Sequence, residues 1–187
     1  MRALSFRPSL TMRGRKFKGL RGWAGKPLHP PLTDVPVGAY VLVAAFDVIS
    51  FLGSDQEWAR DFFRAGTFTL VGGFVVGLAA AATGFWDWLK STQKGTQARR
   101  TVNAHAWTMV AVTVGVLVGV VLRLGTFSDE ASTPGPLLVL SLVVFVLTTL
   151  GGTIGGSLAY DYGFNVETAG DHPVWHESEE DVFPGQH

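Results

Sequence analysis

Four long apolar segments constrain this chain more than any other feature of its sequence. They cover about residues 35–53, 65–89, 103–124 and 136–160. Each is close to the roughly 20 residues that a helix needs to cross the hydrocarbon core of a bilayer. None alternates polar and apolar residues with a period of two, which argues against membrane β-strands. The sequence therefore predicts an all-α protein in contact with the lipid bilayer, a bundle of four transmembrane helices running up-down-up-down.

The composition supports a membrane location and excludes several kinds of site. Only 16% of the residues are charged, whereas about 25% is usual for a soluble domain. The chain has no cysteine, so disulfides, thiolate nucleophiles, Cys-ligated zinc and a Cys-ligated iron–sulfur cluster within this chain are excluded. The phosphate-binding loop, the nucleophile elbow, the zinc-protease helix and the dinucleotide fingerprint are also absent from the sequence. Whether the protein is an enzyme stays open at this point.

Positive charges predict the orientation of the bundle. The chain divides into a basic tail (1–24), a membrane domain (25–163) and an acidic tail (164–187). Lysine and arginine crowd the basic tail and recur in the loop between the second and third segments, as Lys90, Lys94, Arg99 and Arg100. Because cytoplasmic loops carry the excess of such residues, both tails are predicted to be cytoplasmic, in a bacterial inner membrane. No nucleic-acid-binding motif accompanies the basic tail, so anionic lipid is its expected partner and nucleic acid is not.

Four ionisable residues are predicted to share one level of the bundle. His29 and Asp34 precede or begin the first segment, Asp87 is near the end of the second, and His105 is near the start of the third. Alternate helices run in opposite directions, so all four residues are expected near the cytoplasmic interface. Ionisable groups at membrane depth are costly and often mark functional sites.

Several chemistries fit this set. His29 and His105 could ligate the iron of a haem b across the bundle. The same imidazoles with Asp34 and Asp87 could bind zinc or non-haem iron. An Asp–His pair could also pass protons, since histidine titrates near neutral pH. The simplest alternative is a structural layer of helix caps and hydrogen bonds.

Asp47 and Arg123 are predicted on the opposite side of the membrane. Asp47 is 13 residues beyond Asp34, roughly 20 Å along a helix axis at 1.5 Å per residue. An ion pair of Asp47 with Arg123 or with Arg64 is the expected arrangement. A substrate or ion site at Asp47 is the alternative.

Glycine pairs at a spacing of four residues predict close helix packing. The pairs are Gly73/Gly77, Gly115/Gly119, Gly151/Gly155 and Gly152/Gly156. Such spacing removes side-chain bulk from one helix face and lets two backbones approach. The contacts could form within one bundle or between the subunits of a homo-oligomer.

Three stretches of sequence together resemble a known bacterial membrane family. The first is 28–38 with Asp47 after it, the second is 84–88 followed by 103–105, and the third is 155–163. This combination is similar to the family called domain of unknown function 2231, over about residues 24–166. The resemblance implies a small four-helix membrane protein of undefined activity. Many members have a second histidine where this chain has Asp34.

The resemblance also suggests partners. Members of the family occur fused to, or beside, Rieske iron–sulfur or cytochrome c modules, which implies a role in electron transfer. In this chain such a partner would be a separate protein. The favoured hypothesis is thus a redox-associated membrane subunit that binds haem b and works with a Rieske or cytochrome partner. The alternatives are a non-catalytic anchor or scaffold that uses its two tails, and a protein that handles protons or ions through Asp47 and Asp87.

Overall fold

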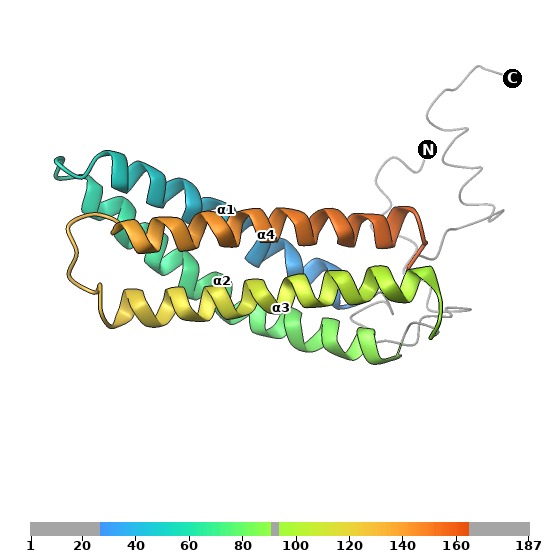
Figure 1. The fold of residues 1–187 in the computed structure, drawn as a ribbon. Coiled ribbons are helices and arrows are strands. Elements are labelled where there is room, and N and C mark those ends of the chain that lie inside the picture. Colours follow the sequence, from blue (N-terminus) through green and yellow to red (C-terminus); the bar gives the residue numbers. More distant parts are fainter. Residues whose placement is uncertain (1–26, 91–93, 165–187) are drawn as a thin grey trace, which may run out of the picture.

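A computed structural model describes residues 27–90 and 94–164, and its regular elements there are four α-helices (Figure 1). They are α1 (His29–Leu52), α2 (Ala59–Lys90), α3 (Gln97–Leu124) and α4 (Gly135–Tyr160). Each helix is long and apolar enough to cross a membrane, so the prediction of four transmembrane helices is confirmed. The predicted tails, 1–24 and nearly all of 164–187, lie outside the described residues.

α1, α2 and α3 each begin about six residues earlier than the apolar segments indicate, at 29, 59 and 97 against about 35, 65 and 103. α1 starts at His29, and Pro30 and Pro31 follow in its first turn. Proline suits this place because its fixed φ matches the helix and its missing N–H has no partner to lose there. α2 starts at Ala59 and carries Asp61 in its first turn, where a carboxylate is favoured by the helix dipole. Hydropathy alone misses all three starts, because the first turns are polar or rich in proline.

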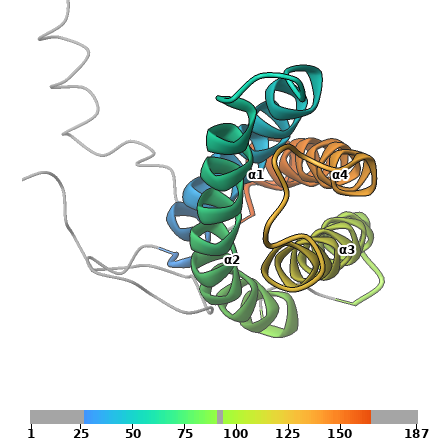
Figure 2. The same ribbon diagram turned by 90° about the vertical axis from the view of Figure 1, so that its left-hand side faces the viewer.

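The helices form an antiparallel bundle with two distinct ends (Figure 1). The starts of α1 and α3 and the ends of α2 and α4 lie together at what we call the terminal end. The α1–α2 and α3–α4 loops lie at the opposite end, the loop end. Around the bundle, α1 packs against α2 and α4, and α3 packs against the same two helices (Figure 2). α1 and α3 therefore face each other diagonally, and only long inward side chains can join them.

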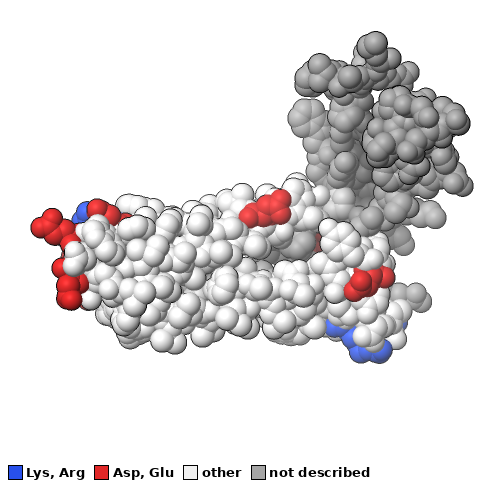
Figure 3. All heavy atoms as spheres, turned by 90° about the horizontal axis from the view of Figure 1, so that it is seen from above, with Lys and Arg blue, Asp and Glu red and all other residues white. Residues whose placement is uncertain are grey.

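The bundle is apolar inside and outside, as expected of a membrane domain. Its core is a cluster of buried side chains from all four helices: Tyr40, Val43, Leu70, Val112, Val116 and Val144. Large apolar side chains are also widely exposed, among them Leu52 at 79% and Phe68 at 75%. On the face that Figure 3 shows, charged side chains lie at the loop end and in the half nearer the terminal end, where one acidic patch lies well inside that end, and an uncharged surface separates the two groups. That uncharged surface matches the hydrocarbon core of a bilayer.

Most of the paired glycines face neighbouring helices. A Cβ added at Gly73 would lie 2.7 Å from the Cβ of Ala39, and one at Gly151 would lie 2.5 Å from the Met109 sulfur. Close helix packing within the bundle therefore depends on these glycines. Gly152 and Gly156 are different, because an added Cβ would have no neighbour within 4 Å. The homo-oligomer expected from glycine-rich faces stays a prediction.

Candidate functional site

His29 and His105 meet in the interior of the bundle near the terminal end. His29 is the first residue of α1, and His105 lies in the third turn of α3. Their ring centroids are 6.4 Å apart and their planes are inclined at 77°. The structure therefore brings together the two imidazoles that the topology had placed at one level, from helices that lie diagonally across the bundle.

Each imidazole is held by a backbone carbonyl of the helix that follows its own in sequence. The Nδ1 of His29 lies 2.8 Å from the carbonyl oxygen of Ala80, and the Nδ1 of His105 lies 2.9 Å from that of Gly151. A carbonyl oxygen can only accept, so each Nδ1 carries the hydrogen. In the neutral rings the lone pair is then on Nε2. Histidines that bind metals usually donate their other ring N–H in this way.

The two carboxylates predicted at this level are placed differently from each other. Asp87 is 3% exposed and lies on the face of α2 that also carries Ala80 and Thr83, both buried. Asp34 is exposed on α1. Within residues 27–90 and 94–164, no group of three or more His, Asp or Glu side chains is arranged to hold a metal ion. The assignment of Asp34 and Asp87 to a metal stays a prediction, and the imidazole pair is the more compact candidate.

Aromatic side chains tie α2 to α3 beside the imidazole pair. The indole N–H of Trp88 donates to the Asn103 side-chain oxygen at 2.7 Å. The Trp88 ring meets Trp107 edge-on at 6.0 Å, and the Arg99 guanidinium lies 5.7 Å from its centroid. Arg99 also donates to the Trp88 carbonyl. These contacts hold the end of α2 against the first turns of α3, which carries His105.

A second polar cluster lies toward the loop end. Asp47 and Arg123 form an ion pair and are 0% and 2% exposed. Asp47 also accepts a hydrogen bond from the Thr133 hydroxyl at 3.0 Å, and Arg123 donates to the Thr67 hydroxyl at 3.2 Å. Of the two partners considered for Asp47, the structure thus places Arg123 beside it, whereas Arg64 is exposed. The pair links α1, α2, α3 and the loop before α4.

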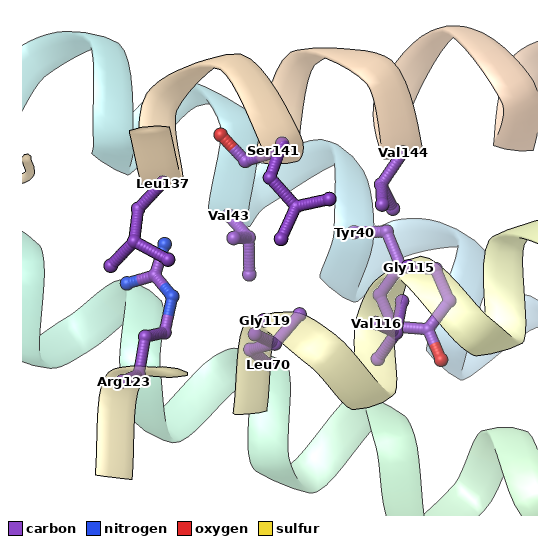
Figure 4. Close-up of a pocket in the computed structure, with 11 residues that line it drawn as sticks. Tyr40, Val43, Leu70, Gly115, Val116, Gly119, Arg123, Leu137, Ser141 and Val144 are labelled. Atoms are coloured by element: carbon purple, nitrogen blue, oxygen red, sulfur yellow. The ribbon is translucent and has the colours of Figure 1, made fainter. Parts of the chain in front are cut away.

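A small cavity lies between Arg123 and the apolar side chains of the core. The close-up in Figure 4 shows Arg123 at one end and mostly apolar side chains around the space, including Val43, Leu70 and Val144. About 10 Å³ is open to the centre of a water-sized molecule, room for roughly one water. This volume is too small for an organic substrate. The ion pair is therefore best interpreted as a structural tie between helices.

Thr148 on α4 differs from most of the described helical threonines in its hydrogen bonding. Seven threonine hydroxyls donate to the carbonyl four residues earlier in their own helix: Thr67, Thr83, Thr101, Thr108, Thr113, Thr149 and Thr153. The Thr148 hydroxyl is fully buried and has no hydrogen-bond partner. A buried hydroxyl without a partner costs about 1–3 kcal/mol.

We therefore expect Thr148→Val to stabilise the purified protein by about 1 kcal/mol, because valine keeps the shape and removes the unpaired group. The measurement is the denaturation midpoint in detergent. Thr149→Val is the matched control, since Thr149 is exposed and bonds the Phe145 carbonyl at 3.0 Å. A Thr148→Val variant less stable than both the wild type and this control would contradict the prediction and show that the hydroxyl is satisfied.

The comparison with known families agrees with this architecture. A family model described as a predicted membrane protein, DUF2231, matches residues 25–168. The chain belongs to the DUF2231 family. Neither a curated protein nor a solved structure matches it. In this DUF2231 protein, the matched region contains all four helices and both imidazoles.

Proposed function

We propose that this DUF2231 protein is a membrane redox subunit that holds haem b between His29 and His105. The observation that carries the proposal is the pair of inward imidazoles, each with Nδ1 fixed by a carbonyl and Nε2 left to bind. An imidazole nitrogen lies about 2.0–2.1 Å from a metal that it binds, so two imidazoles that hold one group must lie close together. The two ring centroids are 6.4 Å apart, which would let both residues hold the same group.

The donor set also favours haem over a bare metal ion. A metal ion bound only by protein side chains usually takes three or four of them, and the described residues contain no group of three candidate ligands. Haem brings four nitrogens of its own, so two histidines from facing helices complete its ligands. When bound, haem would supply one-electron transfer within the membrane.

The chain's own residues prepare the two imidazoles for this role. Donation from Nδ1 to the Ala80 and Gly151 carbonyls fixes each ring's orientation and makes each Nε2 a stronger ligand. Electron exchange with a separate Rieske-type or cytochrome partner is part of the proposal. Because the chain has no cysteine, an iron–sulfur cluster in this scheme would belong to the partner.

The proposal is tested by the absorption spectrum of the detergent-purified protein, expressed with a supply of haem, together with an analysis of bound metals. We expect a Soret band and about one iron per chain, because each bundle has one such pair of histidines. Colourless protein without iron would refute the proposal.

We further propose that the terminal end faces the cytoplasm of a bacterial inner membrane, in accordance with the positive-inside rule. The absence of cysteine allows a clean test with single-cysteine variants. Ser54→Cys lies in the α1–α2 loop and Lys94→Cys between α2 and α3, and both positions are exposed. A membrane-impermeant maleimide added to spheroplasts is expected to label Ser54→Cys alone. Both variants should react after permeabilisation, and the reverse pattern in intact spheroplasts would invert the orientation.

A further inference from the structure

The two halves of the bundle hold their imidazoles in the same way. In the α1–α2 hairpin, His29 donates to the carbonyl of Ala80, and Gly84 lies four residues after that carbonyl. In the α3–α4 hairpin, His105 donates to the carbonyl of Gly151, and Gly155 lies four residues after it. The arrangement of imidazole, carbonyl and glycine is therefore repeated, although the two hairpins share no obvious sequence repeat.

Each glycine lies directly against the imidazole that uses the carbonyl one turn earlier. A Cβ added at Gly84 would be 2.5 Å from Cε1 of His29, and also 2.8 Å from Nδ1 and 3.0 Å from Nε2. A Cβ added at Gly155 would be 3.1 Å from Cε1 of His105. In both halves the ring atom nearest to the added Cβ is Cε1, the carbon between the two nitrogens.

Helix geometry explains why glycine is needed at that place. A carbonyl inside a helix already accepts from the N–H four residues later. Side chains tilt toward the helix N-terminus, so the side chain at that later residue lies over the carbonyl's free lone pair. Glycine uncovers the lone pair, and an imidazole N–H can then approach from a neighbouring helix.

We propose that Gly84 and Gly155 are positioning residues for the imidazole pair. Each opens a helix carbonyl to an imidazole, fixes the tautomer with hydrogen on Nδ1, and leaves Nε2 able to bind a ligand. The part of this proposal that concerns the bound ligand rests on the proposed haem function. The part that concerns the tautomer does not.

The test compares glycines on the same helix. Gly84→Ala is expected to reduce the Soret absorbance per protein by roughly tenfold. This is the lower limit of the loss in metal affinity that usually follows when a ligand loses its hydrogen-bond partner. Gly155→Ala should cause a smaller, few-fold loss, because the added carbon is 0.6 Å farther from Cε1 (3.1 Å against 2.5 Å). Gly72→Ala on α2 and Gly156→Ala on α4 are the controls, since an added Cβ has nothing within 4 Å at either position. Both controls should keep the wild-type absorbance.

A second readout separates this proposal from the haem proposal. In the full-length protein expressed without added haem, the ¹⁵N shifts of labelled histidine should show hydrogen on Nδ1 for two rings. Gly84→Ala should remove that signature for one ring, and the two controls should keep it. If the wild-type protein binds no haem, the haem proposal fails. The ¹⁵N shifts of the variants then decide whether the two glycines position the imidazoles. If Gly84→Ala does not fold, the test compares the ¹⁵N shifts of Gly155→Ala with those of Gly156→Ala. Equal shifts in these two variants would overturn the proposal.

Discussion

His29→Ala and His105→Ala are each expected to lower the Soret absorbance of the purified protein by roughly tenfold or more. Removing even the hydrogen-bond support of a metal ligand costs 10–100-fold in affinity as an order of magnitude, and removing the ligand itself costs at least as much. The two variants should behave alike, because each imidazole is held by a helix carbonyl at a similar distance, 2.8 Å and 2.9 Å.

Thr108→Ala is the matched control for the histidine variants. Thr108 lies one turn beyond His105 on α3, and its hydroxyl bonds only its own helix, at the Ala104 carbonyl. Helix content by circular dichroism and elution as a single species should be the same for all these proteins. Histidine variants that keep the wild-type absorbance would exclude the pair as haem ligands, even if the wild type is coloured.

The fold could be predicted from the sequence because lipid imposes a length on every helix that crosses it. Four apolar runs of that length were sufficient to establish the number and order of the helices. The starts of α1, α2 and α3 were missed because proline and charge hide a first turn from a hydropathy scale. The shared level of His29 and His105 followed from the topology, since alternate helices reverse direction.

The inward faces of the helices could not be predicted in the same way. In a soluble bundle an apolar stripe marks the buried side, but a helix surrounded by lipid is apolar all round. Nothing in the sequence therefore distinguishes buried Asp87 from exposed Asp34, or buried Thr148 from its exposed neighbour Thr149. The roles of Gly84 and Gly155 were missed for a related reason. A glycine is informative only once its neighbour is known, and a glycine four residues after a carbonyl that accepts from histidine is recognisable only in three dimensions.

The largest effect on stability is expected at the buried ion pair. Arg123→Met should destabilise the bundle by about 3–5 kcal/mol, because it leaves the Asp47 carboxylate buried without its counter-charge. For a domain of this size, such a loss lowers the thermal midpoint by on the order of 10 °C. Thermal denaturation in detergent, followed by circular dichroism, measures the shift. Arg64→Met is the control on α2, since Arg64 is exposed and surface changes usually stay within about 0.5 kcal/mol.

The double variant Asp47→Leu/Arg123→Met distinguishes a structural tie from a functional charge. Replacing both members of a buried pair by apolar residues is often neutral or stabilising, so the double variant should recover most of the stability lost in Arg123→Met. Its haem absorbance should equal that of the wild type, because the pair lies toward the loop end and the imidazoles lie near the terminal end. A double variant as unstable as Arg123→Met would mean that the hydrogen bonds to Thr67 and Thr133 carry the stabilisation. A stable double variant that loses the Soret band would instead give the ion pair a part in the function.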